Sequence, residues 1–211
     1  MNKIFKFESE KLANWYFRLN GFFTIPNFVV HPEIGRGQRT DIDVLGVRFP
    51  NRKEIFKMED HNTPICSSEL ISIVLAEVKL DVCRINQAWR SRDKGNYERV
   101  LRAIGLFKEA GVNAVANQLY ENGHYSDKSC QVSLVCIGKR TNHNIRRKYN
   151  KILQLTWEEI LRFIYGRSSE FRNQKSSHGQ WEEIAKELWD CSIYSKNENE
   201  FIENVAKRIV E

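Results

Sequence analysis

Residues 39–47 read RTDIDVLGV, and residues 71–80 read ISIVLAEVKL. Both stretches consist mostly of aliphatic and β-branched residues, a composition typical of strands buried in a sheet. Each stretch also carries ionisable side chains, which are costly inside a core unless something compensates their charge. These two segments therefore decide the fold, and their charged residues are the first candidates for chemistry.

The charged residues of each segment stand two positions apart. Because side chains alternate between the faces of a strand, Asp41 and Asp43 leave from one face. Glu77 and Lys79 share a face of the second strand for the same reason. If the strands are neighbours, carboxylates and an ammonium meet beside a hydrophobic core. A divalent cation with oxygen ligands neutralises such carboxylates, and a nearby lysine stabilises developing negative charge, which is the chemistry of a nuclease.

An Asp on one strand followed by Glu-x-Lys on the next resembles the PD-(D/E)xK nuclease superfamily, which has the restriction-endonuclease-like fold. Asp43 stands where the family has its metal-binding Asp, and residues 77–79 stand where it has (D/E)-x-K. The resemblance covers roughly residues 5–165. No proline precedes Asp43, although one is common in the family, and the length of segment 44–76 means that the hairpin carries a long insertion.

The resemblance implies that Asp43, Glu77 and Lys79 are catalytic and that the two acids bind Mg²⁺ or Mn²⁺. Asp41 is a candidate for a further metal ligand, or it orients Arg39 at the mouth of the strand. Each of these residues also has a structural explanation, since Asp43 can cap a turn and Glu77 with Lys79 can form an ion pair.

Two more residues are candidates for the site. Many family members have an acid on the first helix, shortly before a Gly-Phe pair. Glu10 fits that place before residues 21–22, with Glu8 as its competitor. Gln87 resembles a polar residue that assists the site in some members, although glutamine is also common at helix starts.

Basic residues are concentrated in two segments. Segment 139–151 holds six Lys or Arg residues, and a second group brackets the Asp43 strand. Such runs are usually solvated loops, but on a nuclease they would contact phosphates. The predicted nucleic-acid-binding residues are Arg36, Arg39, Lys139, Arg140, Arg146, Arg147 and Lys148.

Composition places limits on the class of protein. The chain has 211 residues, 41% of them hydrophobic, and a net charge of +6, which suits a polyanionic partner. Its five cysteines include no C-x-x-C pair, which argues against a zinc knuckle and favours a reducing cytosol. No signal peptide or membrane span is evident, so we expect a cytoplasmic protein, and a homodimer is compatible with this interpretation.

The order of predicted elements agrees with an α/β fold, a restriction-endonuclease-like mixed sheet flanked by helices. The expected core helices span residues 8–20, 97–110 (closed by Gly111), 114–121 and 156–165. The first is predicted by the helical spacing of Leu12, Trp15, Tyr16 and Leu19, and the last by a capping box that begins at Thr156. The expected strands span residues 22–30, 40–49, 71–80, 131–137 and 151–155, and Pro26 places the first of them at a sheet edge or in a bulge. We expect a nuclease-like core over residues 1–166. A small α-helical extension over residues 167–211 would contain helices at 180–189 and 198–210.

The sequence thus predicts a metal-dependent nuclease that hydrolyses phosphodiester bonds, most simply of DNA, in repair, recombination, restriction or defence. One alternative is a catalytically idle nuclease-fold module that binds nucleic acid or protein. A second alternative is an RNA-directed nuclease or toxin, which shares the motif. Retention of Asp43, Glu77 and Lys79 together favours an active enzyme.

Overall fold

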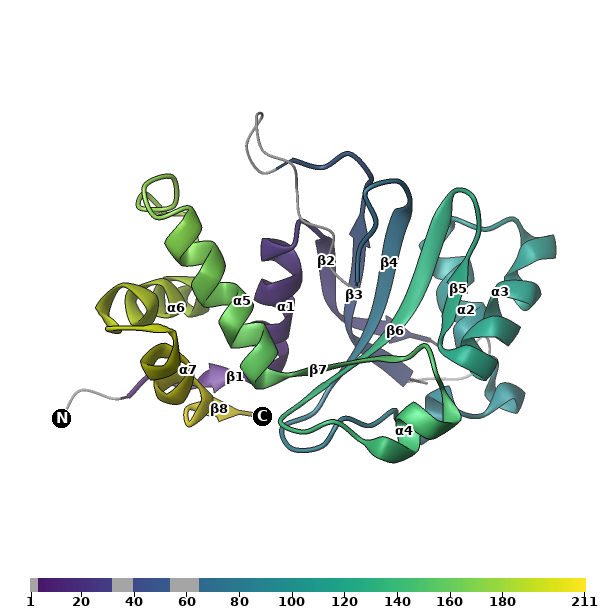
Figure 1. Cartoon of the computed structure of the whole chain (residues 1–211). Helices are drawn as coiled ribbons and strands as arrows, with labels where there is room; N and C mark the ends of the chain where they lie inside the picture. The colour runs from purple at the N-terminus through teal and green to yellow at the C-terminus, as the bar shows by residue number, and fades with distance from the viewer. Residues whose placement is uncertain (1–3, 32–39, 54–64) are drawn as a thin grey trace.

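A computed structural model of the chain describes residues 4–31, 40–53 and 65–211. Within these residues, a mixed six-stranded sheet lies between helices on its two faces (Figure 1). The strand order is β2-β3-β4-β6-β5, and β7 also pairs with β6. The strands are β2 Phe23–Val30, β3 Thr40–Arg48, β4 Ile71–Val78, β5 His124–Ser126, β6 Cys130–Gly138 and β7 Leu153–Thr156. The predicted α/β class is confirmed.

Strand directions bring the two charged segments to the same end of the sheet. β3 is antiparallel to both β2 and β4, whereas β4, β6 and β7 run parallel to one another. The start of β3 therefore lies beside the ends of β4 and β6. β2 pairs only with β3 in the described part of the chain, so it is an edge strand, as the presence of Pro26 predicted.

Helices α1 (Ser9–Leu19) and α5 (Trp157–Glu170) cover one face of the sheet. α1 was predicted from its apolar spacing, and it buries Leu12, Trp15 and Leu19. The sheet meets these helices with small aliphatic side chains that alternate along the strands. They are Val44, Val74, Ala76, Val78, Val135 and Ile137.

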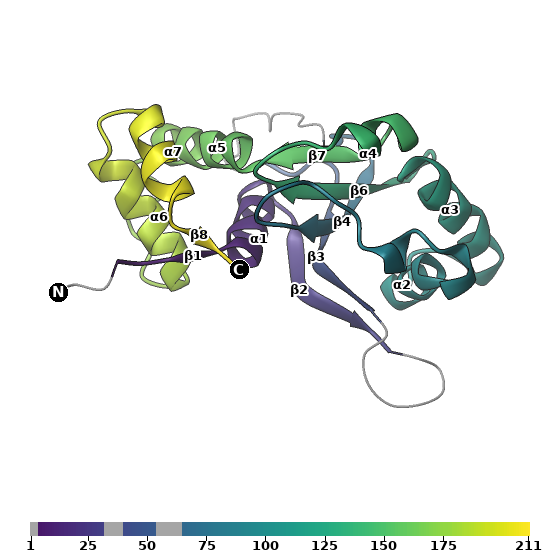
Figure 2. The same ribbon diagram turned by 90° about the horizontal axis from the view of Figure 1, so that it is seen from below.

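Helices α2 (Asn96–Ile104) and α3 (Glu109–Asn122) cover the other face, as both views show (Figures 1 and 2). The expected helix over 97–110 is wrong in its second half. α2 ends at Gly105, whose φ of +72° is the left-handed conformation that favours glycine at a helix end, and Gly111 lies inside α3. β5 was not predicted, and neither was the short helix α4 (His143–Lys148).

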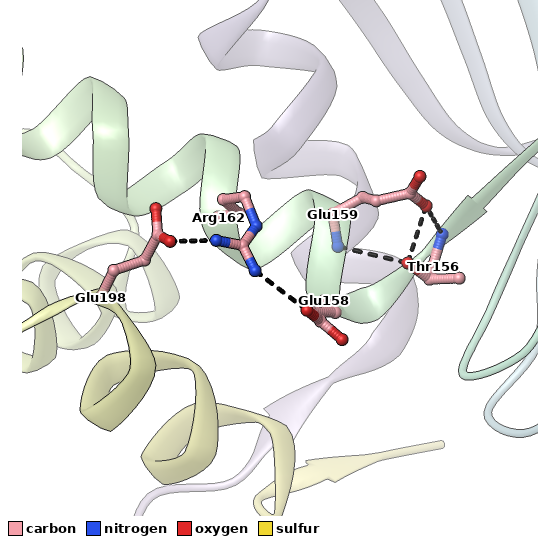
Figure 3. Close-up of polar contacts among 5 residues, drawn as sticks. All are labelled: Thr156, Glu158, Glu159, Arg162 and Glu198. Atoms are coloured by element: carbon pink, nitrogen blue, oxygen red, sulfur yellow. Dashed lines mark hydrogen bonds and ion pairs between the residues drawn. The ribbon is translucent and has the colours of Figure 1, made fainter.

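α5 begins with the capping box that the sequence predicted. The Thr156 hydroxyl accepts from the backbone N–H of Glu159, and the Glu159 carboxylate accepts from the backbone N–H of Thr156 (Figure 3). One turn later, Arg162 donates to Glu158 on α5 and to Glu198 on α7. These contacts fix the start of α5 and link it to the C-terminal helices.

The predicted C-terminal helices are present as α6 (Glu183–Tyr194) and α7 (Glu198–Ala206). Their apolar residues join the same core cluster as those of α1 and α5. β8 (Ile209–Val210) then pairs in parallel with β1 (Phe7–Glu8), directly before α1. The proposed boundary at residue 166 falls inside α5, which continues to Glu170.

β6 ends at Gly138, where the chain that follows β4 passes too close for a side chain. A Cβ atom at Gly138 would lie 2.8 Å from the backbone nitrogen of Cys83. The backbone N–H of Cys83 donates to the carbonyl oxygen of Arg140 at 2.9 Å. In turn, the backbone N–H of Arg140 donates to the carbonyl oxygen of Asp81 at 2.9 Å. The segment that follows Lys79 is thereby tied to the basic segment that follows β6.

Candidate active site

The β3–β4 ladder stops where the charged residues begin. Its paired residues run from Arg48 with Ser72 to Val44 with Ala76. At the next position, a carboxylate oxygen (Oδ2) of Asp43 accepts the backbone N–H of Val78 at 2.6 Å. Asp43 is 7% exposed, so its carboxylate is buried and takes the place of a main-chain acceptor.

Lys79 follows the last residue of β4, and its ammonium lies between two carboxylates. Its Nζ is 3.4 Å from Oδ2 of Asp43 and 3.3 Å from Oε2 of Glu77. The side chains of these three residues are 16%, 10% and 8% exposed, in the order Lys79, Asp43, Glu77. The structure therefore brings Asp43, Glu77 and Lys79 together at one nearly buried place, and their catalytic roles remain predictions.

The Glu77 carboxylate is enclosed by apolar side chains. Residues that line the space around it include Ile42, Ile85, Trp89 and Tyr97. Neither carboxylate oxygen has a hydrogen-bond partner in the described part of the chain. Burial raises the pKa of Glu77 to about 7, and the Asp43 charge raises it as well, whereas Lys79 and the backbone N–H of Asn86 partly offset the rise.

Burial and the neighbouring carboxylates shift the pKa of Lys79 in opposite directions. Burial alone lowers the pKa of this ammonium, because a desolvated charge is unfavourable. Glu77 and Asp43 outweigh that effect, so the net shift of the Lys79 pKa is upward. The lysine is therefore a stable cation at neutral pH, held next to two acids.

Glu10 and Asp41 lie near this group without completing it. Glu10 is in the first turn of α1, and its pKa is raised by burial and then by the charges of Asp43 and Asp41. Asp41 is half-buried on β3, opposite Val29 of the edge strand. The helix thus directs Glu10 toward the same acids, as the sequence predicted, whereas Glu8 forms an exposed pair with Lys11.

The donors fit a magnesium or manganese ion that keeps part of its water shell. Across residues 4–31, 40–53 and 65–211, no three Asp, Glu, His or Cys side chains converge to hold one metal ion. Mg²⁺ is commonly bound by only one or two carboxylates, together with waters and substrate phosphate oxygens. The carboxylates of Glu77 and Asp43, both paired with Lys79, supply such a donor set. A cation held by Asp43 and Glu77 stays a prediction.

The predicted basic residues separate into three groups. Arg36 and Arg39 lie outside the described residues. Arg140 donates to both carboxylate oxygens of Asp81 at 2.9 Å, so its charge already has a partner. The remaining ones are exposed: Lys139 follows β6, and Arg146, Arg147 and Lys148 lie on α4.

α4 is attached to the body of the protein by Ile145 and Tyr149, which are buried. Its basic residues therefore face outward at the end of the sheet where β4 and β6 finish. The sequence predicted this stretch as either a solvated loop or a phosphate-contacting segment. The structure shows an exposed basic helix here, and its contact with phosphates stays a prediction.

Gln87 begins the short 3₁₀ helix η1 (Gln87–Trp89) and is exposed. It lines a hollow outside the acid pair, and among the described residues no hydrogen bond joins it to Glu77. Sequence reasoning missed three residues of this loop: Trp89, which walls Glu77, and Arg84 and Arg90, which line the same hollow as Gln87. The only sequence signal for the two arginines was their positive charge in a segment without hydrophobic periodicity.

No match was found in comparisons of the chain with models of protein families, with curated proteins or with solved structures. In the described part of the chain, no helix has the length and apolar character needed to cross a membrane. The functional argument therefore depends on the geometry of the site itself.

The raised pKa of Glu77 predicts a pH-dependent effect of Glu77→Gln on stability. The pKa is about 7 in the folded protein and near the ordinary 4.5 when unfolded, so the folded state retains the proton longer. The folding free energy contributed by Glu77 is therefore lost as the pH rises from about 4.5 to 7. Glu77→Gln should gain stability relative to the parent between pH 5 and pH 8.

Urea denaturation at several pH values, in EDTA, measures this difference. Glu203→Gln, which removes an exposed acid from α7, is the matched control and should give a difference that is independent of pH. A pH-independent difference for Glu77→Gln as well would show that Glu77 is not held in an unfavourable ionised state.

Proposed function

We propose that this protein is a metal-dependent nuclease that hydrolyses phosphodiester bonds, with DNA as the favoured substrate. The observation that carries the proposal is the buried pair of Asp43 and Glu77 joined by Lys79. A stable core gains little from two carboxylates and an ammonium in this place, because their desolvation offsets much of their attraction. Perturbed ionisable groups of this kind are concentrated at functional sites.

In this proposal, Asp43 and Glu77 hold Mg²⁺ or Mn²⁺. When bound, the ion supplies charge stabilisation and a more acidic water. Val78 fixes Asp43 by donating its N–H to the carboxylate, which leaves the other oxygen of Asp43 for a ligand. The apolar wall around Glu77 excludes bulk water and strengthens the electrostatic interactions inside.

Lys79 has the role of placing a positive charge beside the scissile phosphate. Its ammonium remains charged at neutral pH and is positioned by two acids from different strands. A metal ion between the acids would take over their neutralisation, because both interactions use the same carboxylates. The ammonium would then be available to a phosphate oxygen or to the attacking water.

The element order supports a restriction-endonuclease-like core as the finer description of the fold. A helix precedes the antiparallel strands β2, β3 and β4, and helices connect β4 to the parallel strands β6 and β7. The acids at the β3–β4 end have the spacing of the proposed motif. A role in repair, recombination, restriction or defence agrees equally with this site, and so do a homodimer and a cytoplasmic location.

Two alternatives remain, and the first has an observation in its favour. Asp43 caps the β3–β4 ladder and pairs with Lys79, which is the behaviour of a structural ion network. A module that binds nucleic acid or protein without cutting would retain those contacts. An RNA-directed nuclease would use the same acids, because the site described here contains nothing that reads a 2′-hydroxyl.

Lys79→Arg separates an enzyme from a binding module. A guanidinium keeps the charge but is larger and planar, so it does not replace a compact ammonium between two acids. We expect nucleic-acid affinity within a few-fold of the parent and a loss of cleavage of roughly 10²-fold or more.

The assay uses plasmid, single-stranded and branched DNA, and RNA, with Mg²⁺, Mn²⁺ or EDTA. Asp43→Asn and Glu77→Gln should abolish cleavage, and Arg172→Lys, an exposed position remote from the site, should leave it unchanged. Full activity of Lys79→Arg, or no metal-dependent cleavage by the parent, would favour the binding module.

Neutralising α4 tests the proposed interface with nucleic acid. Replacing Arg146, Arg147 and Lys148 with Gln should weaken binding to DNA of every sequence and reduce its dependence on salt, because phosphate contacts release counterions. Fluorescence anisotropy with two unrelated duplexes in EDTA, over a range of NaCl concentrations, measures both effects. If the affinity of the variant depends on salt as steeply as that of the parent, α4 is an ordinary solvated helix.

A further inference from the structure

Beside the acid pair lies an open hollow of about 580 Å³ that the proposed chemistry does not use. It is formed by the loop after β4 and the start of η1, and its lining residues are Arg84, Ile85, Asn86, Gln87, Arg90 and Ser91. The lining contains two guanidinium groups, two side-chain amides and one hydroxyl, but no acid. A hollow with this chemistry suits an anion.

The two arginines of the hollow are exposed and, like Arg146, Arg147 and Arg172, carry charges that no acid of the described residues compensates. In the described residues, neither Arg84 nor Arg90 has an ion pair or a side-chain hydrogen bond. By contrast, Arg92 pairs with Glu121, Arg140 with Asp81, and Arg162 with Glu158. Because Arg84 and Arg90 line one hollow that contains no acid, both charges are available to a shared anionic ligand.

The hollow is separated from the Glu77 carboxylate by a single turn of chain. Ile85 lines both the hollow and the apolar space around Glu77. The backbone N–H of the next residue, Asn86, lies close enough to Glu77 to lower its pKa. A ligand in the hollow would therefore lie immediately next to a group bound at the acids.

The loop is rigidly attached, which gives the arginines a defined position. Trp89 is 3% exposed and packs against Tyr97 with ring centroids 5.2 Å apart. The backbone N–H of Arg90 donates to the carbonyl oxygen of Gln87 at 3.1 Å, which closes the turn. Arg84 and Arg90 thus flank a turn whose centre is anchored in the core.

We propose that Arg84 and Arg90 together bind one phosphate of the substrate strand, the phosphate adjacent to the scissile bond. Guanidinium groups bind phosphate oxygens through two parallel hydrogen bonds, and Gln87 supplies a further donor. The hollow is open, so the strand continues through it, and the bound group is an internal phosphodiester. This inference rests on the proposed nuclease function for the position of the scissile bond.

The test measures binding in EDTA, so it does not depend on cleavage. The probe is a fluorescent single-stranded oligonucleotide with hydroxyl groups at both ends, and the same oligonucleotide with a 5′-phosphate or a 3′-phosphate. Arg84→Ala/Arg90→Ala is compared with Arg172→Ala/Lys196→Ala, which removes the same charge from exposed positions at the α5–α7 end of the molecule. Affinities are recorded between 50 and 300 mM NaCl.

The double variant should bind all three probes about 10-fold or more weakly, because it loses charge-assisted hydrogen bonds. The slope of log affinity against log salt should become shallower by about 0.7, the contribution of one phosphate on a single strand. The control variant should retain the affinity and slope of the parent.

An unchanged slope, or the same loss in the control, would overturn the proposal. A loss confined to a probe with a terminal phosphate would replace it with recognition of strand ends, and a change of about twice 0.7 would assign the arginines to separate phosphates. If the parent cuts no nucleic acid but the expected change of slope is seen, the nuclease function fails and the phosphate site stands.

Discussion

The burial of two like charges in a hydrophobic sheet is the constraint on which the rest of the structure depends. Asp43 and Glu77 are each less than one-tenth exposed, and burying charged groups costs free energy unless their charge is compensated. Lys79 compensates the charge of both, but one ammonium cannot neutralise two carboxylates. Burial raises the pKa of Glu77 to about 7, and the Asp43 charge adds to the rise, whereas Lys79 partly offsets it.

The fold around Asp43 and Glu77 holds both acids in their buried positions. The backbone N–H of Val78 holds Asp43, and the rings of Trp89 and Tyr97 close the apolar side of Glu77. Gly138 lets the chain after β4 lie directly on the end of β6. The same contact ties the segment that leads to Arg84 and Arg90 to the segment that leads into α4.

Much of this arrangement follows from local sequence rules. The alternation of side chains placed Glu77 with Lys79, the apolar runs identified β3 and β4, and the Thr156–Glu159 capping box marked the start of α5. The prediction of one helix over residues 97–110 was wrong because Gly105 and Gly111 are both typical of residues that end a helix. The choice between them depends on the tertiary contacts of Phe107, which packs on Tyr125 in the connection between the helices.

The parts of the site that were not predicted come from loops. Arg84, Trp89 and Arg90 follow no periodic pattern, so their proximity to Glu77 depends on how the chain turns after β4. The capping of the β3–β4 ladder by Asp43 also requires the strands to separate at one particular residue, which hydrophobic patterns do not specify. Glu10 was predicted as a neighbour of the acids only through a family resemblance, whereas in the structure its pKa is raised by burial first and then by the charges of Asp43 and Asp41.

The most direct test of the account is the location of bound Mn²⁺ by anomalous X-ray diffraction from crystals soaked in millimolar MnCl₂. The account predicts an anomalous peak within about 2.5 Å of a carboxylate oxygen of both Asp43 and Glu77, with the Lys79 ammonium moved away from at least one of them. The peak should be lost in crystals of Glu77→Gln. Lys79 still bridging the two acids in soaked crystals, with no manganese between them, would contradict the claim that they form a metal site.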